Sequence, residues 1–158
     1  MTTIALLENE LLERIQTVPQ FGDRGFSIFN LDEVGDIAAA GVGFPLAAVA
    51  YIGTVPRENS VNTTSGVQSA AADIIMVQKQ FAVLVAVEYN WSDTENTKVV
   101  ATDLLDQVRG KLLGFKGVNK RPWTLLDEGP AESNIDAAIL YMQTWATLTH
   151  DKGDSAEQ

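Results

Sequence analysis

The first 20 residues show the spacing of apolar side chains that is typical of an amphipathic helix. Apolar residues recur there at intervals of three and four, and polar residues fill most of the positions between them. The recurring residues are Ile4, Leu7, Leu11 and Ile15. Pro19 marks the end of this helix, because the residue before a proline is driven out of helical geometry.

Two capping patterns predict the starts of further helices. Ser92 and Glu95 match a capping box, in which the serine accepts a hydrogen bond from a backbone N–H and the glutamate reaches back. The helix that follows has an apolar stripe formed by Val100, Leu104, Val108 and Leu112. Asn30 and Glu33 give a similar signal for a short helix over residues 32–40.

An uncharged stretch of 20 residues, 37–56, has the length of a membrane-spanning helix. Three glycines and Pro45 interrupt it, and much of its apolar content is alanine. A short helix followed by a buried strand over residues 46–52 accounts for this pattern better. We therefore expect no membrane span and no membrane partner.

Five segments are predicted to be β-strands, from their apolar, β-branched and aromatic residues: 24–29, 46–52, 74–89, 125–129 and 135–150. The second strand and the second half of the third are apolar on both faces, as expected for strands covered above and below. Residues 125–129 are expected to lead into a turn. Residues 53–70 collect Gly, Pro, Asn, Ser and Thr, which predicts a long loop that projects as an arm.

These elements predict an α/β (α+β) fold with a single mixed or antiparallel sheet. About four to five strands form the sheet, and two main helices plus a short helix flank it. Residues 1–150 are expected to form one domain, which includes the long loop. Residues 151–158 are polar and are expected to be a disordered C-terminal tail.

Composition then excludes several kinds of chemistry. The chain of 158 residues has no cysteine and one histidine, so thiolate catalysis, disulfides, cysteine-based metal sites and multi-histidine sites within one chain are all excluded. The formal net charge is −10. An acidic surface repels phosphate, so we expect no specific binding to nucleic acid or to anionic membranes.

No catalytic constellation emerges from the remaining candidates. Gly41 and Gly43 follow a predicted helix rather than a strand, unlike a dinucleotide-binding loop. His150 is expected to lie exposed at the end of the last strand. Asp127 and Glu128 are sequence neighbours that point apart, so we interpret them as turn and surface residues. We expect no enzymatic activity, no cofactor and no metal.

Five of the 11 Lys and Arg residues of this acidic chain cluster between positions 109 and 121, at the end of the second long helix and in the turn-prone connection over residues 117–121. Such a cluster is either a solvated surface or a contact with an acidic neighbour. We predict a protein–protein interface formed by Arg109, Lys111, Lys116, Lys120, Arg121 and Arg57. The tryptophans at positions 91, 123 and 145 are each expected to be core residues, although at least one is a candidate interface residue.

Four segments carry a resemblance to a known family: residues 45–53, 80–87, 104–115 and 125–129. Together with the first helix and the long final strand, they resemble the tail terminator (tail completion) proteins of long-tailed bacteriophages of the Mu-like type. The most distinctive piece is the helix end Leu112-Leu-Gly-Phe115.

The resemblance implies a structural virion protein. Such proteins form a homo-oligomeric ring, usually a hexamer, that caps the tail tube and ends its polymerisation. The ring also provides the joining surface for the head–tail connector (neck) protein, and DNA passes through it without specific binding. The implied location is the head-proximal end of the virion tail, after assembly in the cytoplasm of the bacterial host.

Two other interpretations of the sequence stay open. One is a monomeric, non-enzymatic α/β module that binds a single phage or host protein. The other is an enzyme that uses only carboxylates. Sizing the purified protein separates a ring from a monomeric module.

Overall fold

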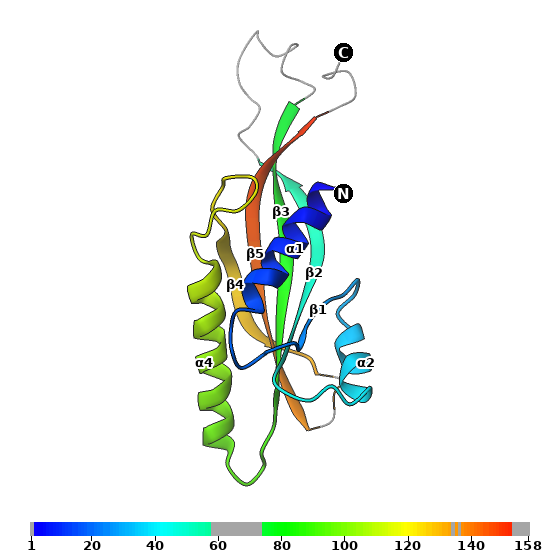
Figure 1. The fold of residues 1–158 in the computed structure, drawn as a ribbon, viewed down its shortest axis with the longest axis vertical. Helices are drawn as coiled ribbons and strands as arrows, with labels where there is room; N and C mark the ends of the chain where they lie inside the picture. The colour runs from blue at the N-terminus through cyan, green and yellow to red at the C-terminus, as the bar shows by residue number, and fades with distance from the viewer. Residues whose placement is uncertain (1, 58–73, 134, 136, 153–158) are drawn as a thin grey trace.

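A five-stranded mixed sheet forms the centre of the computed structural model, which describes residues 2–57, 74–133, 135 and 137–152 (Figure 1). The strand order is β1-β2-β3-β5-β4. The bounds are β1 Gly25–Ser27, β2 Leu46–Pro56, β3 Ile74–Glu88, β4 Thr124–Ala131 and β5 Ala138–Lys152. β1 runs parallel to β2, and the other neighbours are antiparallel. The predicted fold class is confirmed.

Two long helices cover one face of this sheet. They are α1 (Thr3–Ile15) and α4 (Thr94–Leu112), and Figure 1 shows α1 crossing the sheet with α4 alongside it. The apolar faces of both helices meet alternate residues of the central strands in the larger core. Its members include Leu7, Leu11, Val49, Phe81, Val83, Leu104, Val108 and Trp145. The predicted stripe of α4 is wrong at Val100, which is exposed, and Ala101 is buried there instead. Burial of this much apolar surface is the main source of stability.

The opposite face carries a smaller core under the short helix α2 (Glu33–Ala39). Val34 is fully buried there against alternate residues of β2 and β3. The capping prediction for α2 is correct at Glu33, whose Oε2 accepts from the backbone N–H of Asn30 at 3.0 Å, but the N-cap residue is Asp32 rather than Asn30. For α4 the prediction is wrong by one residue. Asp93, rather than Ser92, accepts from the N–H of Asn96, because Ser92 is held by the Asn90 side chain.

Several predicted boundaries differ from the structure. β1 is shorter than the predicted 24–29, and β5 begins at Ala138 rather than at residue 135. Three other strand ends extend further than predicted. β2 continues through residues 53–56, so the predicted loop begins later, and residues 58–70 lie outside the described residues. β4 continues to Ala131 instead of turning after residue 129. β5 includes Asp151 and Lys152, so it extends two residues into the predicted tail, while residues 153–158 also lie outside the described residues. In each case cross-strand pairing extends a strand beyond its apolar segment.

β4 forms one edge of the sheet, and two irregularities interrupt it. A bulge at Leu126 shifts the register between Leu125 and Asp127. Pro130 lies within the strand, which is tolerated at an edge because proline has no N–H to donate.

Candidate assembly interface

Residues 113–122, which we call the basic loop, connect the C-terminal end of α4 to β4 and form the yellow loop above α4 in Figure 1. The basic loop exposes three cationic and two apolar side chains: Lys116, Lys120, Arg121, Leu113 and Val118. Leu113 and Val118 are 64% and 60% exposed, respectively. Half of the predicted interface residues therefore lie together on one projecting segment.

Backbone hydrogen bonds close the basic loop on itself. The N–H of Gly114 donates to the carbonyl of Trp123, and the N–H of Trp123 donates to the carbonyl of Phe115, both at 3.0 Å. The N–H of Lys120 donates to the carbonyl of Gly117, also at 3.0 Å. Lys120 has a φ of 59°, an unusual conformation for a residue with a side chain. The turn therefore has a defined shape.

A carboxylate from α1 anchors one side of the basic loop. Glu10 accepts two hydrogen bonds, from the N–H of Val118 at 3.1 Å and from Nε1 of Trp123 at 3.1 Å. A Cβ placed on Gly117 would lie 1.3 Å from Oε1 of Glu10. Glycine at 117 thus provides the space in which the carboxylate binds the loop.

Asn119 anchors the other side of the basic loop to β5. Its Nδ2 donates to Oγ1 of Thr147 at 3.0 Å and to the carbonyl of Leu148 at 2.8 Å. Its Oδ1 accepts from the N–H of Arg121 at 3.3 Å. Anchors on both sides hold the cationic side chains on a preorganised backbone, which lowers the entropy cost of binding a partner.

The segment leading into the basic loop is also fixed, through Arg14 of α1. Its Nε donates to the carbonyl of Lys111 at 2.8 Å, and its guanidinium carbon lies 4.3 Å from the centre of the Phe115 ring. Lys111 is half-buried on the last turn of α4. Of the predicted interface residues, Lys111 is therefore close to the basic loop but less accessible.

Arg109 has partners within its own chain. It pairs with Asp106 one helical turn away and with Glu128 of β4. Oε2 of Glu128 also accepts from Nε2 of the fully buried Gln143 at 3.1 Å. The interpretation of Asp127 and Glu128 as turn residues is wrong, because both lie within β4 and Glu128 is half-buried there. Arg109 is a structural link between α4 and the sheet.

Arg57, the remaining predicted residue, is remote in sequence but lies near the basic loop. Arg57 and Arg121 line the same cavity of about 390 Å³, at the ends of β2 and β4. Its walls also include Val55, Gln78 and Leu148. Arg57 is held against β3, since its N–H donates to the carbonyl of Met76 at 3.0 Å. The fold therefore adds a fourth cation to this end of the molecule.

The three tryptophans divide between core and surface. Trp123 and Trp145 are fully buried, and Nε1 of Trp145 donates to Oε1 of Gln143 at 2.9 Å. Trp91 is 78% exposed and lies edge-on to Tyr89, with ring centroids 4.3 Å apart. Only Trp91 is thus positioned to contact another molecule.

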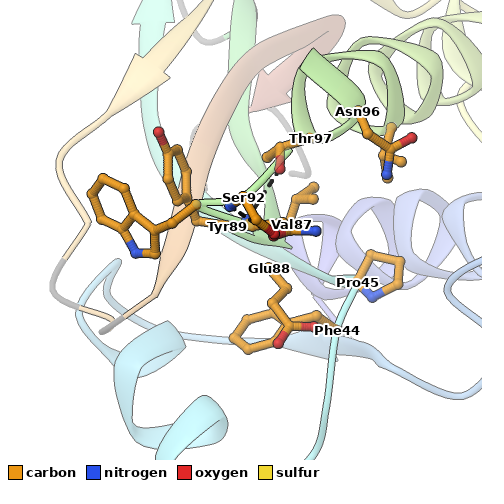
Figure 2. Close-up of a pocket in the computed structure, with 11 residues that line it drawn as sticks. Phe44, Pro45, Val87, Glu88, Tyr89, Ser92, Asn96 and Thr97 are labelled. Carbon is orange, nitrogen blue, oxygen red and sulfur yellow. Dashed lines mark hydrogen bonds between the residues drawn. The ribbon is translucent and has the colours of Figure 1, made fainter. Parts of the chain in front are cut away.

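A second surface feature lies at the opposite, N-terminal end of α4. We call this cavity of about 650 Å³ the aromatic pocket (Figure 2). Three aromatic residues line it: Phe44, Tyr89 and Trp91. Glu88, an exposed residue at the end of β3, is the one charged residue among its lining residues. Of these residues, the sequence indicates only Trp91 as a candidate interface residue, because Phe44 reaches the pocket from a distant segment.

His150 and the acidic side chains are the remaining candidates for metal binding. His150 is exposed in β5 opposite Met76, as predicted. Among the described residues, no three or more His, Cys, Asp or Glu side chains come together as metal ligands would. Within the same residues, no helix combines the length and the apolar content needed to span a membrane.

No protein-family model matches the chain. A search of curated proteins likewise gave no significant match. The functional argument therefore depends on the residues and on their arrangement.

Proposed function

We propose that the chain is a structural virion protein without enzymatic activity: a tail terminator that assembles into a ring of six copies. In this function it caps the tail tube, ends its polymerisation and joins it to the head connector. The resemblance described above supports the proposal. Three of the four segments that carry it, residues 45–53, 80–87 and 104–115, contribute β2, β3 and α4 to one shared core.

The main structural support for self-assembly is the basic loop. Lys116, Lys120 and Arg121 project from an anchored backbone beside two exposed apolar side chains. Because the chain has a net charge of −10, many carboxylates on one copy are available to pair with the cationic loop of another copy. Oppositely charged, preorganised surfaces on one chain favour self-association.

The negative net charge of the chain is also compatible with the passage of DNA through a ring of six copies. Six copies at −10 each carry a formal charge of −60. A channel with excess negative charge repels phosphate, so DNA moves through it without binding.

The mass in solution and negative-stain images test the proposal. Light scattering is expected to give about 103 kDa for a closed ring of six 17.1 kDa chains. Lys116→Glu is expected to shift the ring toward monomers, since it reverses one cation of the basic loop. Lys98→Glu makes the same charge change at an exposed site of α4 outside the basic loop and should not shift the ring toward monomers. The assembly should weaken as salt concentration rises.

The termination function needs a separate test with tail tubes assembled in the absence of the protein. Labelled protein should bind at a single end of each tube and stop its growth. A strict monomer at high concentration that also leaves tubes unbound would overturn the proposal and favour the monomeric binding module.

A further inference from the structure

We infer that the basic loop of one copy binds the aromatic pocket of a second copy, an inference that rests on the proposed self-assembly. The basic loop follows the C-terminal end of α4 (Figure 1), whereas residues at and before the N-terminal end of that helix line the aromatic pocket. At about 1.5 Å per residue, the 19 residues of α4 separate them by roughly 28 Å. The anchored loop of one copy therefore cannot fill its own pocket.

The chemistry of the aromatic pocket suits a cationic occupant. Ammonium and guanidinium groups bind to the faces of aromatic rings and pair with carboxylates. The pocket offers Phe44, Tyr89, Trp91 and the Glu88 carboxylate, and no cationic residue lines it. Glu88 and Phe44 line the same side of the pocket (Figure 2). Trp91 adds a large, exposed apolar surface of the kind that is enriched in binding hot spots.

The basic loop suits this pocket in charge and in size. Its tip places Val118, which is 60% exposed, between the two exposed lysines 116 and 120. The pocket volume of about 650 Å³ lies in the range of roughly 300–1,000 Å³ that is usual for well-formed binding sites. The tip of a short loop, with one apolar and one or two cationic side chains, is an occupant of suitable size.

The arrangement also explains how assembly closes. A contact between two different surfaces of the same chain is head-to-tail, and it forms a closed ring when each copy is rotated by a fixed angle relative to the last. Six copies close when that angle is about 60°. A single type of contact is therefore sufficient for a hexamer.

Cysteine cross-linking tests the contact directly, because the natural chain has no cysteine. Val118→Cys at the tip of the basic loop is mixed with Asn96→Cys, an exposed residue that lines the aromatic pocket. Under mild oxidation, disulfide-linked dimers should form in the mixture. The matched control replaces Asn96→Cys with Thr102→Cys, an exposed residue of α4 outside the pocket lining, and should give roughly tenfold less dimer.

A charge reversal in the pocket gives the second measurement. Glu88→Lys, introduced into the Asn96→Cys chain, should lower the cross-linked yield roughly tenfold. Glu132→Lys, at an exposed position that does not line the pocket, should not. Circular dichroism confirms that each variant is folded.

The outcomes distinguish this inference from the proposed function. If the wild-type protein forms a ring but the cysteine variants give no cross-links between residues 118 and 96, the loop–pocket contact is overturned and the proposed ring is not. Cross-links that Glu88→Lys does not reduce would also overturn it. A wild-type protein that is monomeric and forms no cross-links would overturn both.

Discussion

The carboxylate of Glu10 fills the space that a side chain at Gly117 would need. A Cβ on Gly117 would lie 1.3 Å from Oε1 of Glu10 and 1.8 Å from its Cδ. This close approach lets one carboxylate of α1 bind both the backbone of the basic loop and the indole of Trp123. The shape of the predicted interface therefore depends on a residue of the first helix.

Gly117→Ala should loosen the basic loop without changing any charge. The methyl group displaces the Glu10 carboxylate, so two hydrogen bonds to a charged acceptor are lost, at a cost of about 1–3 kcal/mol of unfolding free energy. Urea unfolding measures the loss, and light scattering should show weaker assembly. Gly110→Ala is the control: its Cβ meets open space within α4, so the protein should become more stable by about 0.5–1 kcal/mol. Equal effects of the two substitutions would contradict this account of Gly117.

Arg109→Ala should weaken the fold more than it weakens assembly. It leaves the half-buried carboxylate of Glu128 without its cation, at a cost of about 1–2 kcal/mol because 31% and 24% of the two side chains remain exposed. A double-mutant cycle with Glu128→Gln isolates the coupling between them in urea unfolding. If the losses of unfolding free energy in the two single variants add up to the loss in the double variant, the interaction between Arg109 and Glu128 does not contribute to stability.

Asp151→Asn should destabilise the end of β5. Nζ of Lys79 lies 3.0 Å from Oδ2 of Asp151, and the lysine is only 6% exposed. Removing the carboxylate leaves a buried ammonium group, at a cost of about 1–3 kcal/mol after allowance for the exposed side of Asp151. Lys79→Met in the same chain should recover most of the loss, since it removes the unpaired charge. Thermal unfolding measures both, and no recovery would contradict the proposed cause.

Trp91→Ala and Trp145→Ala should have opposite consequences. Trp91 is 78% exposed, so its removal should leave the unfolding free energy nearly unchanged and weaken assembly. Trp145 is fully buried, so its removal should cost about 3–5 kcal/mol. Urea unfolding and light scattering on the same samples separate the two effects. A Trp91→Ala variant that assembles normally would exclude Trp91 from the interface.

Local patterns predicted the elements whose signals lie within one segment. The spacing of apolar residues in α1 and the doubly covered apolar runs in β2 and β3 appear in the structure at nearly the predicted positions. The start of α4 was misplaced by one residue, because Ser92 and Asp93 are both good capping residues and only the turn geometry decides between them.

The site was predicted less completely, because it depends on contacts between distant segments. The basic residues were visible as a cluster, but the sequence does not show that Arg109 pairs with Glu128, 19 residues away. It also does not show that Glu10 anchors Val118, 108 residues away. The aromatic pocket was missed for the same reason, since Phe44 and Trp91 come together only in the folded chain.

The interrupted edge at β4 restricts how copies of this chain can join. A regular edge strand exposes a row of N–H and C=O groups onto which another strand can add, and this is the route by which sheets grow into fibres. The bulge at Leu126 interrupts that row, and Pro130 has no N–H to donate, so β4 is a poor template for adding a strand from a second copy. We therefore expect contacts on this side to use side chains. Under the proposed function, in which the chain ends the growth of a tail tube, this edge would also hinder the chain from polymerising through its own sheet.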